Sequence, residues 1–63
     1  MKDNTIIQTH DFRVFKLKIN GVQYFFVARC EQKGYLTVFK TEYEAYLCML
    51  NFQDEYDNGT LIF

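Results

Sequence analysis

The 63-residue chain contains few side chains that could catalyse a reaction, with one histidine, two cysteines and no serine. Nucleophilic catalysis needs a base beside a nucleophile. The sequence suggests one such set, His10, Asp11 and Cys30, because Asp11 faces Cys30 if two neighbouring strands pair around a tight turn. A chain this short has little volume for a pocket beside its core. We therefore expect an exposed His10 and no enzymatic activity.

The two cysteines also give little reason to expect a metal. Cys30 and Cys48 lie 18 positions apart, with His10 as their one possible companion, whereas structural zinc needs four closely paired ligands. None of the three glycines belongs to a phosphate-binding loop. The sequence predicts no metal and no cofactor, and it predicts that both cysteines are small buried hydrophobes in a reducing compartment.

Composition indicates one small folded domain spanning residues 1–63. Apolar residues make up 49% of the chain and aromatic residues 19%, so large side chains can supply the buried area that a short chain needs. No apolar run approaches the roughly 18 residues of a membrane span, and the N-terminus lacks a signal-peptide core. Residues with AT-rich codons are abundant, which favours a low-GC genome, and so short a reading frame is expected of an accessory gene of a phage or mobile element. We expect a cytoplasmic protein without membrane association, in the host cell if it is phage-encoded.

Glycines mark the turns between the strands that must position these side chains. Asn20-Gly21 can form a two-residue type I′ turn between strands at 11–19 and 22–30, and residues 31–34 lead to a third strand at 35–40. This pattern predicts a three-stranded antiparallel meander. Residues 1–6 are expected to be loose or to form a short edge strand.

One helix is predicted over residues 42–56. Thr41 and Glu44 form a capping box, in which the Thr41 hydroxyl accepts the Glu44 amide and the Glu44 carboxylate reaches back to the Thr41 amide. The run 57–59, Asp-Asn-Gly, ends the helix. Residues 60–63 look extended and could add a short terminal strand or fill the core. The fold class is α+β, with the sheet packed on one C-terminal helix.

The two faces of the first hairpin are both apolar. The turn pairs Phe15 with Phe26, and this face is predicted to meet the helix, together with Leu17, Ile19, Val22 and Tyr24. The opposite face is predicted to expose a dimer or partner patch formed by Phe12, Val14, Phe25 and Val27. A four-residue second loop would add Leu36 and Val38 to this patch, whereas a bulge at Gly34 would place them with the core, so the register stays open.

The helix is more apolar than one small sheet face requires. One stripe is formed by Tyr43, Tyr46, Leu47 and Leu50, and it is extended by Ala45, Met49, Phe52 and Tyr56. Excess apolar surface on both layers indicates a homodimer or a partner protein. Alternatively, the termini, with residues 6–7 and 61–63, fold over these surfaces.

Charge divides the chain at residue 40. Residues 1–40 carry seven basic and three acidic side chains, and residues 41–63 carry five acidic and no basic ones. The carboxylates of Asp54, Glu55 and Asp57 oppose the dipole at the helix C-terminus, so local stability does not explain them. We expect this acidic end to dock on a basic surface of a larger protein, with Phe52 and Tyr56 as anchors.

These features predict a non-catalytic protein-binding module. It would be homodimeric and would act as a regulator or inhibitor that sterically blocks a host protein of replication, transcription or defence.

The alternative is a small DNA- or RNA-binding protein that reads nucleic acid with a basic and aromatic sheet face. Its phosphate contacts would be Arg13, Lys16, Lys18, Arg29 and Lys40. The run 39–45, FKTEYEA, resembles the strand-to-helix junction of sheet-reading DNA-binding modules such as the arm domains of phage integrases and plant AP2 domains, and this resemblance implies DNA binding. The sequence pI of about 5.6 argues against this alternative.

Overall fold

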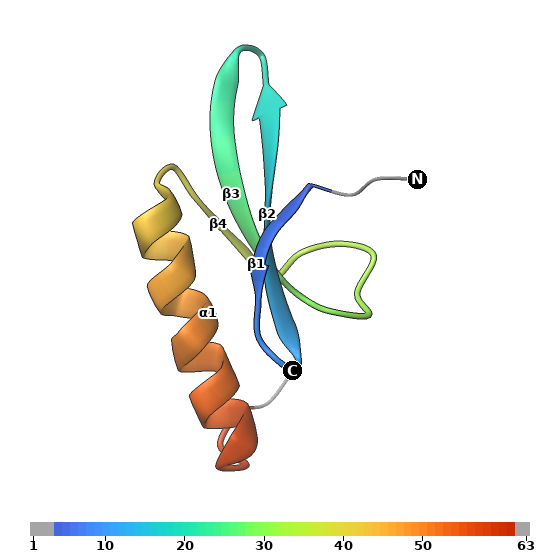
Figure 1. The fold of residues 1–63 in the computed structure, drawn as a ribbon, viewed down its shortest axis with the longest axis vertical. Coiled ribbons are helices and arrows are strands. Elements are labelled where there is room, and N and C mark those ends of the chain that lie inside the picture. Colours follow the sequence, from blue (N-terminus) through green and yellow to red (C-terminus); the bar gives the residue numbers. More distant parts are fainter. Residues whose placement is uncertain (1–3, 62–63) are drawn as a thin grey trace.

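Four strands form one antiparallel sheet, and one face of this sheet is covered by a single helix (Figure 1). A computed structural model describes residues 4–61. The elements in chain order are β1 (Thr5–Gln8), β2 (Phe12–Ile19), β3 (Val22–Arg29), β4 (Thr37–Phe39) and α1 (Glu42–Asp57). The strands are neighbours in that same order. The predicted α+β class is confirmed, and the sheet gains β1 at its edge.

The β2–β3 hairpin has the predicted turn and register. Asn20 and Gly21 both adopt positive φ angles, 53° and 82°, as a type I′ turn requires. Phe15 pairs with Phe26, and Ile19 pairs with Val22 next to the turn. The turn end of the hairpin projects beyond β1, β4 and the helix (Figure 1).

The third connection settles the register that the sequence left open. Val38 pairs with Phe26, and Phe39 pairs with Phe25. Relative to a four-residue loop, this pairing is shifted by one position, which turns every β4 side chain to the other face. Val38 therefore shares the face of Phe26, while Leu36 packs against the core beneath α1.

Helix α1 begins and ends close to the predicted positions. The Thr41 hydroxyl accepts the Glu44 amide at 3.3 Å, as predicted, and it donates to the Glu44 carboxylate at 2.9 Å. At the other end Gly59 has a φ of 74°, and Thr60 donates its amide to the Glu55 carbonyl at 2.9 Å. This is a Schellman ending.

The predicted terminal strand at 60–63 is absent from residues 60 and 61, and residues 62–63 lie outside the described part of the chain. Leu61 packs against the core instead, which matches the core-filling alternative.

The helix covers the sheet face that the sequence analysis assigned to solvent. Phe12, Val14 and Val27 are fully buried together with Ala45 and Met49 of α1, and Phe25 packs against this cluster. The predicted exposed patch of Phe12, Val14, Phe25 and Val27 is therefore wrong. The shifted register places Phe39 opposite Phe25, on the same face of the sheet. Because only two residues separate β4 from α1, the helix packs on the face to which Phe39 points.

Candidate protein-binding surface

The three residues that could have formed a nucleophilic site line one hollow of about 170 Å³, but the hydrogen bonds of the described residues do not join their side chains to one another. The Cys30 amide donates to the Asp11 carbonyl at 2.9 Å, which confirms the predicted pairing. The Cys30 thiol, however, lies near the backbone carbonyls of Thr9 and His10, at 3.8 and 3.9 Å. His10 is exposed, as predicted. Cys30 and Cys48 are half-buried and not disulfide-bonded.

The Asp11 carboxylate instead takes part in a clamp formed by Gln53 of α1. The Gln53 carbonyl oxygen accepts the Thr9 hydroxyl and the Asp11 amide, both at 2.8 Å. The Gln53 amide group donates to the carboxylates of Asp11 at 2.9 Å and Asp57 at 3.0 Å. Asp11 therefore helps to fasten the β1–β2 turn to the helix.

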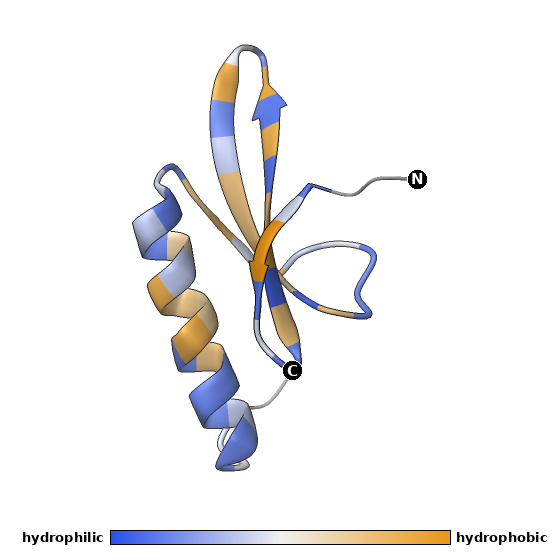
Figure 2. Cartoon of the chain, viewed as in Figure 1, coloured by the Kyte–Doolittle hydropathy of each residue, from blue (hydrophilic) through white to orange (hydrophobic). Residues whose placement is uncertain are grey.

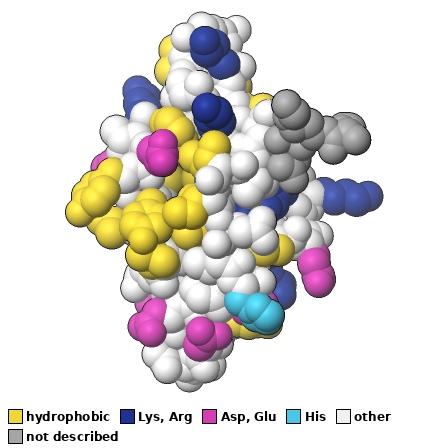
Figure 3. Space-filling model, viewed as in Figure 1, with side chains coloured by type: hydrophobic (Ala, Val, Ile, Leu, Met, Phe, Trp, Pro, Cys, Tyr) yellow, Lys and Arg dark blue, Asp and Glu magenta, His cyan; other side chains and the backbone are white. Residues whose placement is uncertain are grey.

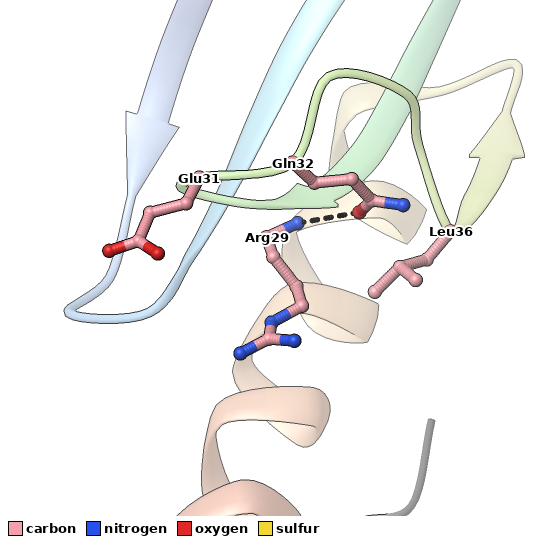
Figure 4. Close-up of a pocket in the computed structure, with 4 residues that line it drawn as sticks. All are labelled: Arg29, Glu31, Gln32 and Leu36. Carbon is pink, nitrogen blue, oxygen red and sulfur yellow. Dashed lines mark hydrogen bonds between the residues drawn. The ribbon is translucent and has the colours of Figure 1, made fainter.

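A hollow of about 350 Å³ lies beside the loop between β3 and β4, and it is lined by Arg29, Glu31, Gln32 and Leu36 (Figure 4). The Gln32 side-chain carbonyl accepts the Arg29 amide at 3.0 Å. The Arg29 side chain points toward α1, and its guanidinium lies 5.8 Å from the centre of the Tyr56 ring. Gln32 and Arg29 thus tie the loop and the helix end to β3.

The predicted anchors at the acidic helix end are largely occupied within the fold. Phe52 and Tyr56 both lie 5.8 Å from Phe12, centroid to centroid, with Tyr56 in an edge-on arrangement. Phe52 is half-buried and packs against the core cluster, so much of its ring is already in contact within the fold. Tyr56 keeps 39% of its surface exposed. Asp54 and Asp57 are exposed and Glu55 is half-buried. The docking role of this acidic end stays a prediction.

The sheet face opposite α1, called the outer face here, carries a cluster of aromatic side chains. Phe26 is at its centre, stacked on Phe15 at 5.1 Å and met edge-on by Tyr35 at 4.8 Å. Tyr24 lies 6.4 Å from Phe26. The loop that carries Tyr35 projects on this side of the sheet, away from α1 (Figure 1). We call Phe15, Tyr24, Phe26 and Tyr35 the aromatic cluster.

Aliphatic side chains continue the aromatic cluster toward the hairpin turn. Leu17 and Ile19 follow Phe15 at every second position of β2, and Val22 faces Ile19 across the hairpin. Alternation along a strand puts these side chains on the outer face. All are exposed, by 41% to 47%, and so is Val38 on β4. We call Leu17, Ile19, Val22 and Val38 the apolar rim. Together with the aromatic cluster it forms one continuous apolar surface in the described chain.

The basic residues of the nucleic-acid alternative do not gather on this surface. Arg13 lies on the outer face, with its guanidinium 4.7 Å from the centre of the Phe15 ring. Lys16 and Lys18 alternate with Phe15 and Leu17, so they lie on the other face of the hairpin. Arg29 points toward α1, and Lys40 precedes it.

The sequence analysis named the residues of the outer face but assigned them to the core. The sequence analysis correctly predicted three cross-strand pairs, which are Phe15 with Phe26, Leu17 with Tyr24, and Ile19 with Val22. Tyr35 was not singled out. The two-residue link between β4 and α1 makes the face that the helix covers depend on the direction of Phe39, and the sequence left that direction open together with the register.

Comparison with protein-family models, with curated proteins and with solved structures gives no match. Residues 4–61 contain no group of three or more His, Cys, Asp or Glu side chains that could hold a metal ion. Within the same range no helix is both long enough and apolar enough to cross a membrane.

Proposed function

We propose that the protein is a non-catalytic binding module that attaches to another protein through the outer face of its sheet. The observation that supports this proposal is the apolar rim, whose four side chains are exposed next to the aromatic cluster on one face. Exposed apolar side chains that adjoin one another are typical of protein interaction sites. Aromatic residues with a neighbouring arginine, here Arg13, are the residue types enriched at binding hot spots.

The mechanism would be steric. The hairpin projects from the body of the molecule (Figure 1). Its outer face exposes Leu17, Ile19 and Val22, of which Ile19 and Val22 are paired across the two strands. Such a ridge can fill a groove on a larger protein and so exclude that protein's normal ligand. We further propose that the protein regulates or inhibits a host protein of replication, transcription or defence; the support for this part is the composition and short length, which favour a phage or mobile-element origin.

A matched pair of variants tests the proposed surface. Ile19→Thr with Val22→Thr keeps two β-branched residues in the hairpin but removes apolar area from the outer face. Lys16→Thr with Lys18→Thr changes the opposite face of the same strand. Affinity-purified partners are identified with the wild-type chain, and binding is then measured by calorimetry with the purified partner. We expect the Ile19/Val22 variant to lose at least about tenfold in affinity, which corresponds to about 1.4 kcal/mol. The lysine variant should change it by less than threefold.

The same variants separate this function from nucleic-acid binding. A shift assay with duplex and single-stranded DNA and RNA at low salt detects the alternative, whose affinity should fall steeply with salt. If nucleic acid binds and the lysine variant abolishes that binding while the Ile19/Val22 variant does not, the proposed protein-binding function is refuted.

A further inference from the structure

Two of the four asparagines are followed by glycine, Asn20-Gly21 in the β2–β3 turn and Asn58-Gly59 after α1. In such a pair the glycine amide nitrogen can attack the side-chain carbonyl of the asparagine, because glycine has no Cβ to block the approach. The product is a cyclic imide, and asparagine is therefore a thermolabile residue. The fold holds the two pairs in very different ways.

The Asn20-Gly21 pair lies at the projecting end of the hairpin (Figure 1). Both residues are exposed, and a Cβ built on Gly21 would meet no atom within 4 Å beyond its chain neighbours. Within the described part of the chain the Gly21 amide donates no hydrogen bond. Ring closure requires rotation about the Cα–C bond of Asn20, out of the type I′ conformation. At this end of the hairpin the rotation disturbs little besides the pairing of Ile19 with Val22.

The Asn58-Gly59 pair is held by the end of α1. The Gly59 amide donates to the Tyr56 carbonyl at 3.1 Å, and the Thr60 amide donates to the Glu55 carbonyl at 2.9 Å. The same rotation at Asn58 would turn Gly59 and the residues after it away from these carbonyls. The hydrogen bonds of the Schellman ending must therefore break before this ring can close.

Charge also favours reaction at Asn20 over Asn58. Attack proceeds through a deprotonated amide nitrogen, and a nearby positive charge stabilises an anion whereas a nearby negative charge destabilises it. Residues 12–30 contain no acidic side chain, and Lys18 lies just before the turn. The charged side chains visible at the hairpin end of the molecule are basic (Figure 3). Asn58 instead follows three acidic residues within 54–57.

We propose that Asn20 is a site of spontaneous modification, at which the chain converts its own turn residue to aspartate or isoaspartate. The Gly21 amide nitrogen gives up its proton and bonds to the side-chain carbonyl carbon of Asn20. The bond from that carbon to the side-chain nitrogen breaks, and the nitrogen leaves as ammonia with the proton. Water then opens the imide at the side-chain carbonyl, giving aspartate, or at the main-chain carbonyl, giving isoaspartate. The net reaction consumes one water and releases one ammonia.

The modification alters the surface assigned above to a protein partner, and this consequence rests on the proposed function. Hydrophobic and hydrophilic residues alternate along both strands as far as the turn (Figure 2), and the two-residue turn keeps Ile19 opposite Val22. Isoaspartate carries the main chain through its side-chain carbons, so it lengthens the turn by one backbone atom and cannot keep the type I′ geometry. Ile19 and Val22 then separate, and binding through the outer face weakens.

Ageing of the purified chain at neutral pH and physiological temperature tests the proposal. Peptide mapping by mass spectrometry follows each asparagine, and an isoaspartate-specific methyltransferase measures isoaspartate. In the folded chain Asn20 should react at least about fivefold faster than Asn58, the effect of one more hydrogen bond that must break first. In urea this difference should shrink, because neither the turn nor the helix end persists.

Two variants serve as matched controls. Asn20→Gly keeps a sequence suited to a type I′ turn and should form no product at position 20. Asn58→Ala should leave the rate at Asn20 unchanged. A folded chain in which Asn58 reacts as fast as Asn20 overturns the proposal. So does a folded chain in which Asn20 stays intact while the chain in urea reacts there.

Calorimetry with the purified partner tests the consequence for binding. The aged wild type should lose affinity, and aged Asn20→Gly should keep it. An aged wild type that contains isoaspartate at position 20 and binds like the fresh protein refutes the effect on binding. Mass spectrometry needs no partner, so failure to find any protein partner would count against the proposed function and leave the result at Asn20 unaffected.

Discussion

Removal of the Gln53 side chain tests how the helix is fastened to the sheet. Three hydrogen bonds join Gln53 to the β1–β2 turn, at 2.8 to 2.9 Å: Gln53 accepts from the Thr9 hydroxyl and the Asp11 amide, and it donates to the Asp11 carboxylate. A net contribution of about 1 kcal/mol for each bond predicts that Gln53→Ala lowers the free energy of unfolding by about 3 kcal/mol. A 63-residue domain has a total of roughly 3–9 kcal/mol. The melting temperature should therefore fall by about 10–20 °C, measured by circular dichroism.

Gln53→Glu distinguishes the clamp from simple packing. The new carboxylate can still accept from Thr9 and Asp11, but it replaces a donor that lies 2.9 Å from the Asp11 carboxylate and 3.0 Å from that of Asp57. Repulsion between carboxylates raises the pKa of the substituted carboxyl in the folded state. The folded variant then binds its proton more tightly than the unfolded chain. The free energy of unfolding of the variant is therefore furthest below that of the wild type at neutral pH. This difference shrinks as the pH falls through the raised pKa.

Adding Asp11→Asn to Gln53→Glu should recover most of the lost stability at neutral pH, because a donor and an acceptor again face each other. Two results would refute the reasoning. One is a Gln53→Ala variant within about 0.5 kcal/mol of wild type, the size of an ordinary surface substitution. The other is a difference in free energy of unfolding between the wild type and Gln53→Glu that does not change with pH.

Two further substitutions probe the burial that the structure assigns. Val14→Ala removes two methyl groups from a fully buried position and should lower the free energy of unfolding by about 2 kcal/mol, whereas Leu17→Ala on the outer face should lower it by under about 1 kcal/mol. Both values are measured by urea unfolding. Equal losses of stability in the two variants would contradict the placement of α1. Burial, and then the charge of Glu55, raise the pKa of the Cys48 thiol. The rate of Cys48 alkylation should consequently rise with pH around a midpoint above that of an ordinary thiol, and Glu55→Gln should lower that midpoint. An unchanged midpoint would show that Glu55 does not act on the thiol.

Local signals in the sequence determined most of the elements. Asn20-Gly21 specified the hairpin turn, because this pair readily adopts two successive positive φ angles. Thr41 and Gly59 marked the two ends of α1 because each satisfies unpaired backbone groups at a helix terminus. These interactions span only a few residues, so they can be read from the sequence without knowledge of the tertiary structure.

The identity of the exposed surface could not be read in this way. Both faces of the hairpin are apolar, so alternation shows which residues share a face but not which face the helix covers. Which face α1 covers depends on a shift of one position between β3 and β4. This shift pairs Phe39 with Phe25 and so places the helix that follows on the same face. Such a shift reverses every side chain of the short strand, and the sequence of the loop left both registers open.

The chain by itself therefore determined its class, its turn, its helix and the pairing of Phe15 with Phe26. Only the tertiary structure decided that Phe12 lies in the core and that Leu17 and Ile19 face outward. Pairing within a hairpin and capping of a helix are local interactions. The choice between two apolar faces is instead made by how the last strand and the helix pack together.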